Sequence, residues 1–308
     1  MSITTRALHE QLDRLRADRV PFVHARVVLA ERPTSAKPGD EALVLADGTI
    51  IGFVGGQCAV STVRNQGLSV LASQRSALVR IAPTPEPEQP GKTVVHNPCQ
   101  SGGTLEIFME PVLPAPLVTV LGSSPIATAL ASIGQSMGYE IATWGCCGAP
   151  DLAVVDAVVV ASHGDDEEST LEAAVRAGVP YIGLVASRTR GAAVLASLDL
   201  TDDDKARITT PAGLDIHART PEEVAVSILA EIIATRGAAR TMPVATGTED
   251  TETTETIEVA IAIDPVCHMQ VAMVPTSIHA EIEGATWWFC CAGCAERFRA
   301  DPARFLDA

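Results

Sequence analysis

The most regular hydrophobic pattern in the chain lies between Pro116 and Gly145. An apolar run containing Val118, Val120 and Leu121 stops at Gly122, as a buried strand does before a tight turn. Apolar side chains then return every three or four positions, which is the spacing of one helix face. These positions are Ile126, Leu130, Ile133 and Met137. Because a second strand-like stretch precedes Gly145, the pattern predicts a strand, a turn, a helix and a second strand.

The turn of this βαβ unit has the composition of an anion-binding loop. In a Rossmann-type opening, backbone N–H groups at the helix start bind a phosphate. Here the usual G-x-G-x-x-G pattern is reduced to Gly122, Ser124 and Ala127, and Thr143-Trp144 stands where an acidic residue would hold a ribose hydroxyl. We therefore predict a nucleotide-type fold without an ordinary NAD site; the alternative is a turn that only joins strand to helix. The candidate cofactor-binding residues are Gly122, Ser123 and Ser124.

Before this unit, the pattern predicts a small α+β domain over residues 1–113. A charged opening helix carries Leu8, Leu12 and Leu15 on one face, and Phe22–Ala30 alternates like a half-buried strand. Asp47-Gly48 predicts a hairpin turn. A helix is expected over about 59–73, with strands over 77–82 and 105–112.

After the unit, strand and helix patterns alternate, which predicts a parallel sheet. We expect strands over 156–161 and 181–185, a helix over 168–177, and a closing helix that begins with Thr220 as N-cap and Pro221. Residues 114–238 therefore form the predicted Rossmann-like domain. Open α/β sheets bind ligands at the C-terminal ends of their strands. The candidate residues at that edge are His163, Asp165, Ser187 and Arg188.

Composition narrows the class of partner. The 308 residues carry a net charge of −16, which repels nucleic acid and anionic membranes. No apolar run approaches the ~20 residues of a membrane span, and the opening segment lacks the apolar centre of a signal peptide. We place the protein in the cytoplasm, where eight cysteines indicate metal or redox chemistry rather than a disulfide framework.

Two cysteines in the first domain lie beside glycine-rich turns. Cys58 opens the helix expected over 59–73, where the helix dipole lowers a thiol pKa and N–H groups favour an anion. We expect the two thiols to line one cavity together with the Gly122 turn; buried cysteines that only fill space are the alternative. The candidate cofactor-binding residues are Gly55, Gly56, Gln57, Cys58, Cys99, Gly102 and Gly103.

These motifs resemble a known family. A D-G-T hairpin, V-G-G-x-C, and C-x-S-G-G before L-E-I-F-x-E-P-V are similar to the xanthine dehydrogenase accessory and carbon monoxide dehydrogenase maturation (XdhC/CoxI-like) family. Gln57 replaces the third glycine of the family pattern and Val60 replaces its glutamate. The family's Rossmann domain carries short motifs that resemble three segments of this chain: SHGDDE, ASRTR and PAGLD. The vicinal pair Cys146-Cys147 departs from the family; it could bind a soft metal or be two surface thiols.

Residues 239–258 are acidic and Thr-rich without a sustained period, which predicts a flexible linker. Residues 259–308 then carry D-P-V-C-x-M, a double aromatic, and F-C-x-x-x-C, which resemble a YHS domain. Residues four apart share a helix face, so Cys290 and Cys294 can bind one ion while Cys267 approaches from a turn. We expect a transition metal such as Zn, with His279 or His268 as fourth ligand and Cys291 as a spare thiol; a merely cysteine-rich fold is the alternative. The candidate metal ligands are Cys267, Cys290, Cys294 and His279.

The resemblance implies a maturation factor for a molybdenum hydroxylase of the carbon monoxide dehydrogenase or xanthine dehydrogenase type. Such a factor holds the molybdenum-pterin cofactor, with the cytosine dinucleotide form as one option, during sulfuration and insertion. The implied partners are the apo-hydroxylase and a cofactor-sulfurating enzyme. The resemblance is also compatible with a homodimer of this chain. A carrier is favoured over a turnover enzyme, because the sequence shows neither a catalytic Ser/His/Asp set nor a catalytic pair of carboxylates. The alternatives are an NAD(P)-dependent oxidoreductase, and a metal-trafficking or redox-sensing protein acting through the YHS module.

Overall fold

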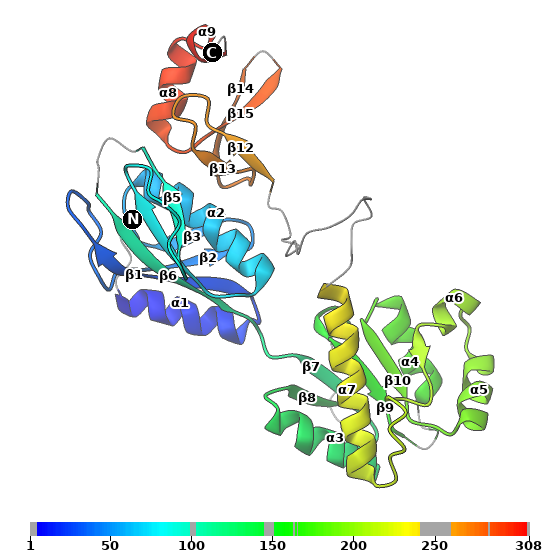
Figure 1. Cartoon of the computed structure of the whole chain (residues 1–308). Coiled ribbons are helices and arrows are strands. Elements are labelled where there is room, and N and C mark those ends of the chain that lie inside the picture. The colour runs from blue at the N-terminus through cyan, green and yellow to red at the C-terminus, as the bar shows by residue number, and fades with distance from the viewer. Residues whose placement is uncertain are drawn as a thin grey trace. The chain divides into compact units, whose positions relative to one another are not determined.

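A computed structural model of the chain describes residues 5–98, 103–144, 151–162, 164, 166–240, 260–282 and 284–306. The chain divides into two compact units (Figure 1). One comprises Met1–Pro114 with Glu252–Ala308, and the other comprises Ala115–Thr251. The C-terminal module therefore shares a unit with the N-terminal domain.

The first unit is built on a six-stranded sheet with the order β3-β2-β1-β6-β4-β5. Its neighbouring strands are antiparallel, except that β4 and β5 are parallel. The strands are β1 (Phe22–Ala30), β2 (Glu41–Leu45), β3 (Ile50–Gly52), β4 (Ala77–Ala82), β5 (Thr93–His96) and β6 (Leu105–Val112).

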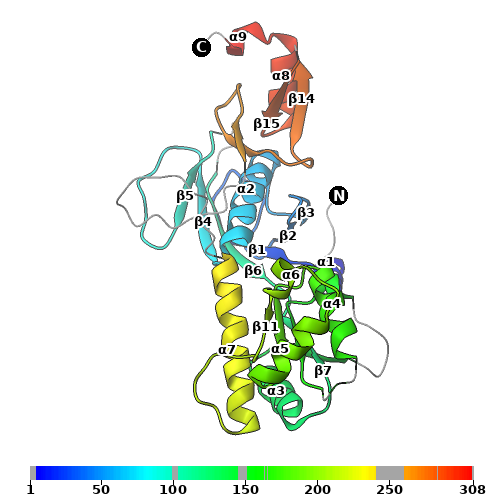
Figure 2. The same ribbon diagram turned by 90° about the vertical axis from the view of Figure 1, so that its right-hand side faces the viewer.

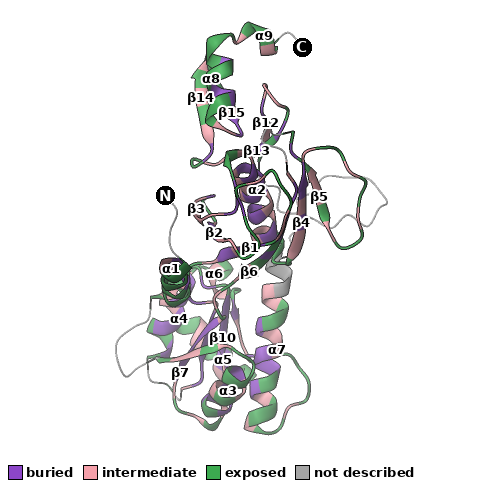
Figure 3. Ribbon diagram, turned by 90° about the vertical axis from the view of Figure 1, so that its left-hand side faces the viewer, coloured by how far each residue is buried: buried purple, intermediate pink, exposed green. Residues whose placement is uncertain are grey.

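Two helices cover opposite faces of this sheet, α1 (Thr5–Ala17) and α2 (Gln57–Ser73). Successive strand residues point to opposite faces. Accordingly, Phe22 joins the apolar cluster of α1, while the adjacent Val23 joins the cluster of α2. Figure 3 shows the buried side of α2 in purple. The sheet face that packs against α2 is therefore buried. Helix α2 also carries Cys58.

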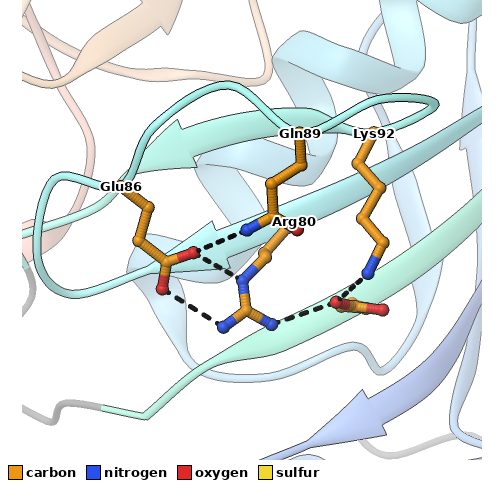
Figure 4. Close-up of polar contacts among 5 residues, drawn as sticks. Arg80, Glu86, Gln89 and Lys92 are labelled. Atoms are coloured by element: carbon orange, nitrogen blue, oxygen red, sulfur yellow. Dashed lines mark hydrogen bonds and ion pairs between the residues drawn. The ribbon is translucent and has the colours of Figure 1, made fainter.

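An ionic network holds the proline-rich connection between β4 and β5 against the sheet (Figure 4). Arg80 Nε donates to Glu86 Oε2 at 2.7 Å and Arg80 Nη1 to Glu106 Oε1 at 3.0 Å. Lys92 Nζ donates to the same Glu106 oxygen at 2.6 Å, and Gln89 Nε2 to Glu86 at 3.2 Å. Arg80 holds the pKa of Glu86 below its usual value, and Lys92 with Arg80 does so for Glu106. The network therefore joins the connection to both β4 and β6.

The second unit is a five-stranded parallel sheet with the order β11-β10-β9-β7-β8. The chain leaves β7 toward β8 and then crosses to β9 on the other side, so the switch point lies between the C-terminal ends of β7 and β9. The strands are β7 (Leu117–Leu121), β8 (Glu140–Trp144), β9 (Ala157–Val160), β10 (Tyr181–Leu184) and β11 (Ile208–Thr209).

Helices cover both faces of the parallel sheet. Leu130 of α3 and Ile228 of α7 pack with Val118 and Val120, whereas Leu171 of α4 packs with the alternate residues of β9. This doubly wound arrangement buries every residue of β7, β9 and β10. The helices are α3 (Pro125–Ser136), a 3₁₀ turn (Leu152–Val154), α4 (Glu167–Arg176), α5 (Arg188–Ser197), α6 (Asp202–Lys205) and α7 (Pro221–Arg240).

The C-terminal module consists of two hairpins and two helices. Phe298 is fully buried, and its ring lies 5.1 Å from that of Trp287 and 5.4 Å from that of Phe289. These aromatic rings supply a core to a module too short to form a large one. The elements are β12 (Ile261–Ile263), β13 (Gln270–Ala272), β14 (Ile278–Ile282), β15 (Ala285–Phe289), α8 (Ala292–Ala300) and α9 (Ala303–Leu306).

Strand β13 packs against α2, as Figure 2 shows at the upper end of that helix. Buried Asn65 of α2 donates from Nδ2 to Gln270 O at 2.6 Å and accepts at Oδ1 from Ala272 N at 2.7 Å. Thr276 Oγ1 also donates to Asp47 O at 3.0 Å. The side-chain amide of Asn65 bonds the backbone of β13 as a neighbouring strand would. It thereby fixes the position of the module on α2.

The predicted fold class is confirmed: a small α+β domain, a Rossmann-like parallel domain and a short cysteine-rich module. The sequence pattern did not reveal β5, α5 and α6. Helix α7 extends to Arg240, since Ala and Arg continue a helix readily; residues 241–259, which hold most of the predicted linker, lie outside the described residues. Within the described ranges, no helix has the length and apolar character needed to cross a membrane.

Candidate metal and ligand sites

Four potential metal ligands meet in the C-terminal module: Asp264, Cys267, Cys290 and Cys294. Asp264 follows β12 and is fully buried. Its Oδ1 accepts from Val266 N at 2.9 Å, which tightens the turn that carries Cys267, and its Oδ2 accepts from Cys290 N at 2.8 Å. Cys294 lies in the first turn of α8. One carboxylate therefore orients two of the three thiols.

The spacing of the four groups fits one ion. Their ligand atoms all lie within 4.8 Å of one another. Cys290 Sγ lies 3.4 Å from Cys267 Sγ and 3.7 Å from Cys294 Sγ. At a metal–sulfur distance of about 2.3 Å, two thiolates on a tetrahedral ion lie roughly 3.8 Å apart. Three thiols and a carboxylate thus suit a four-coordinate ion such as Zn²⁺.

The thiols differ in acidity. The hydrogen bond from Cys290 lowers the pKa of Cys267. Hydrogen bonds to Cys267 and Cys58, together with burial, raise the pKa of Cys290, and burial raises that of Cys294. A cation bound here would displace the thiol protons, because cysteine binds a metal as the thiolate.

Asp264, rather than a histidine, is the described group that joins the three thiols. His279 lies on β14, where its Nδ1 is 2.9 Å from Ser277 O and its ring packs 4.8 Å from Trp288. Its role as a ligand stays a prediction. Asp264 was missed although it stands in the D-P-V-C motif, three residues before a predicted ligand.

The predicted residues Gly55, Gly56, Gln57 and Cys58 form the start of α2. Gly56 is the N-cap, and no side chain caps the helix. Gly56, Gln57 and Cys58 line a cavity of about 590 Å³. The cavity is also lined by Arg32, Thr34 and Ser35, which the sequence pattern did not single out.

Gly103, the described residue of the second predicted glycine motif, lines the same cavity, as does Asn97. Gly103 has φ +100, and a Cβ atom there would clash with Pro33 O, so the close approach of two backbones requires glycine. Cys99 and Gly102 lie outside the described residues, as do Cys146 and Cys147.

Cys58 also meets the C-terminal module. Its Sγ and those of Cys290 and Cys291 lie within 4.8 Å of one another. Cys58 packs with the apolar cluster of that module. No sequence signal paired these thiols, because the packing of β13 on α2 brings them together.

A second cavity, of about 570 Å³, lies at the C-terminal edge of the parallel sheet. The predicted residues Ser187 and Arg188 line it, with Asp215 and His217. Ser187 caps α5 by accepting from Arg190 N at 3.3 Å, and the side chain of Arg188 is 86% exposed. His163 and Asp165 lie outside the described residues.

The Gly122 turn joins β7 to α3 at the switch point. Gly122 has φ +107, and a Cβ atom there would lie 2.6 Å from Ala161 O. Ser124 Oγ caps α3 by accepting from Ala127 N at 3.2 Å. The turn therefore has a structural task, while its binding of a phosphate by Gly122, Ser123 and Ser124 stays a prediction. Cys58 and Gly122 belong to different units, so their common cavity also stays a prediction.

The chain is similar to few curated proteins. It is 26% identical over 250 residues to the uncharacterised protein YqeB of Escherichia coli, covering 71% of this chain and 44% of that protein. It is 27% identical over 158 residues to a Bacillus subtilis protein named as a probable subunit of xanthine dehydrogenase, covering 43% of this chain and 47% of that protein. The chain thus spans about half the length of the curated relatives it matches. A crystal structure of a xanthine dehydrogenase from Bacillus halodurans matches with 18% identity and a TM-score of 0.35, over 74% of this chain and 95% of that chain.

Three family models match successive parts of the sequence. The XdhC and CoxI family matches residues 15–82, and the XdhC Rossmann domain matches residues 118–232. The YHS domain matches residues 262–308. The resemblance seen in the sequence is confirmed: the chain belongs to the XdhC and CoxI family and carries a YHS domain after its Rossmann domain.

Proposed function

We propose that this protein is an accessory factor for a molybdenum hydroxylase and that it binds the molybdenum-pterin cofactor in the cavity beside Cys58. Membership of the XdhC and CoxI family supports the accessory role, as does similarity to a protein named as a probable subunit of xanthine dehydrogenase. The partner by this proposal is an apo-hydroxylase of the xanthine dehydrogenase or carbon monoxide dehydrogenase type.

The observation that carries the proposal is a cysteine in the first turn of a helix that lines a cavity. The cavity volume of about 590 Å³ lies within the ~300–1,000 Å³ typical of small-molecule sites. A soft, sulfur-ligated metal centre suits a thiol such as Cys58. Gly56, the N-cap of α2, supplies no side-chain cap, and the start of a helix is the end that favours an anion such as a phosphate of the cofactor.

Other residues of the cavity suit the remaining chemistry of such a cofactor. The guanidinium of Arg32 can donate two parallel hydrogen bonds to one phosphate. Thr34 and Ser35 carry hydroxyl groups that can donate to or accept from a pterin ring. The bound cofactor would supply the redox centre of the client enzyme, and this chain's residues would hold it and exclude water during sulfuration and transfer.

The cysteine is the sharpest test of the site. Cys58→Ala should reduce the molybdenum and pterin that purify with the protein by about tenfold, because one soft contact of roughly 1.4 kcal/mol is lost. The measurement is elemental analysis together with pterin fluorescence, on protein from a host that makes the cofactor.

Ser187→Ala is the matched control, since Ser187 lines the cavity of the other unit. It should retain the cofactor. Loss in Ser187→Ala with full retention in Cys58→Ala would move the site to the parallel sheet and refute the assignment to Cys58.

Metal handling by the YHS module is the second candidate function. The observation in its favour is the group Asp264, Cys267, Cys290 and Cys294, whose donors fit a four-coordinate ion. Cys294→Ser should abolish zinc binding by the module. If the hydroxylase still matures in a host carrying this variant, the metal is ancillary; if only metal delivery fails, metal handling is the main role.

A further inference from the structure

Three thiols converge at the N-terminal end of α2, one from the N-terminal domain and two from the YHS module. Cys58 lies in the first turn of α2, Cys290 follows β15, and Cys291 is the N-cap of α8. Their sulfur atoms lie within 4.8 Å of one another. Cys58 and Cys291 are half-buried and Cys290 is buried, so the group lies near the surface but largely out of water.

The convergence depends on the packing of one module on the other. Asn65, two turns along α2 from Cys58, makes both hydrogen bonds to β13, and its partner Ala272 is 207 residues away in sequence. Gly48 adds a close approach: a Cβ atom there would lie 2.7 Å from Val274 Cγ2. These contacts restrict sliding of the module along α2, so the three sulfur atoms are held in register.

We propose that Cys58, Cys290 and Cys291 form a second metal site, for a soft ion of low coordination number such as Cu(I), that joins the N-terminal domain to the YHS module. Thiolates select Cu(I) over harder cations. A structural zinc site takes four ligands, whereas this mutually close group offers three, all of them thiols.

Cys290 belongs to both groups of ligands. A thiolate has lone pairs enough to bind two ions, so Cys290 would bridge the ion of the four-donor group and the ion of the three-thiol group. Cys58 in turn lines the 590 Å³ cavity, and the second ion would therefore stand at the cavity wall. This proposal goes beyond the proposed function and does not depend on cofactor binding.

The test is an anaerobic Cu(I) titration of the full chain, loaded with zinc and purified from a host that lacks the pterin cofactor. A competing Cu(I) chelator sets the free copper concentration, and X-ray absorption reports the number of sulfur ligands. Cys58→Ser and Cys291→Ser should each lose one tight equivalent of Cu(I) while they keep zinc. Cys294→Ser is the matched control, because it removes a ligand of the four-donor group only; it should lose zinc and keep that copper equivalent.

Asn65→Ala tests the role of packing with every cysteine intact. It should lose the same copper equivalent and keep zinc, because the modules separate. Wild-type copper stoichiometry in both Cys58→Ser and Cys291→Ser overturns the site, and so does a copper ion with fewer than three sulfur ligands. Full copper retention in Asn65→Ala overturns the dependence on module packing. A cofactor-free host separates these results from any failure of pterin binding.

Discussion

The cavity beside Cys58 and the cavity beside Ser187 are similar in volume, about 590 and 570 Å³, but they offer a ligand different chemistry. Both lie next to the start of a helix. At the first, Gly56 leaves α2 without a side-chain cap. At the second, Ser187 caps α5 and accepts a hydrogen bond from Arg190 N.

This difference favours the cavity beside Cys58 over the cavity beside Ser187 as the proposed site for an anion bound through backbone groups. A helix start exposes N–H groups that need an acceptor, and a serine cap supplies one from the protein itself. At the start of α2 the N-cap residue, Gly56, supplies no such acceptor. Equal volume therefore does not mean equal function, and the following variants separate the two regions.

The largest effect is expected from Gly122→Ala in the parallel unit. Its φ of +107 disfavours any side chain, and the added Cβ atom would lie 2.6 Å from Ala161 O. Positive φ and a backbone clash together should lower the free energy of unfolding of this unit by about 3 kcal/mol. Thermal unfolding followed by circular dichroism and by tryptophan fluorescence should show an earlier transition for this unit alone.

Gly56→Ala is the control for that substitution. Gly56 has φ −71, and a Cβ atom there meets nothing within 4 Å. The variant should unfold close to the wild-type temperature. Equal destabilisation by both substitutions would mean that the close approach of β7 and β9 does not restrict Gly122.

Glu167→Gln should have the next largest effect. Buried Glu167 Oε2 accepts from Arg190 Nη2 at 2.5 Å, and its Oε1 accepts from Ser162 Oγ at 2.8 Å and Gly164 N at 3.1 Å. Burial alone would raise the pKa of Glu167, but these bonds outweigh burial and lower it. Loss of the carboxylate should cost about 2 kcal/mol at pH 7, below the cost of breaking a fully buried pair because Arg190 is partly exposed.

The pH dependence gives the sign of this contribution. A carboxyl whose pKa is lower in the folded state stabilises the fold above its unfolded value, near 4.5, and the stabilisation is lost as pH falls through the folded value. Urea denaturation should therefore show a gap between Glu167→Gln and wild type at pH 7 that closes in acid. Exposed Glu168→Gln is the control, and a gap that persists unchanged in acid would contradict the ionised pair.

The sequence could predict the elements that carry a long regular pattern. The strand Phe22–Ala30 was predicted with its observed bounds, because its residues alternate between a buried and a more exposed face. Helix α3 was predicted from apolar residues at helical spacing, and the start of α7 was predicted from its N-cap Thr220 and from Pro221. In contrast, β5 has four residues of mixed exposure, so its pairing with β4 left no periodic signal.

The meeting of Cys267, Cys290 and Cys294 could be predicted, because one short module carries all three. Their binding of a metal stays a prediction. Their meeting with Cys58 was not predictable, because it depends on the hydrogen bonds of Asn65 to β13 across the chain. Local spacing carries no information about such packing between modules.

The smallest effect, and the sharpest for the comparison, is expected from Gly56→Ser. Its backbone is extended and open, so the new hydroxyl can cap α2 as Ser187 caps α5. A serine cap in place of glycine should stabilise the first unit by only about 0.3 kcal/mol. Because the hydroxyl competes with a phosphate for the same N–H groups, retention of the pterin cofactor should fall about threefold, which corresponds to roughly 0.7 kcal/mol. Gly56→Ala adds the same Cβ atom without an acceptor and should retain the cofactor, in the same fluorescence assay. Equal retention by the serine and alanine variants would show that the start of α2 does not contact the anion, and the two cavities would then lose their main difference.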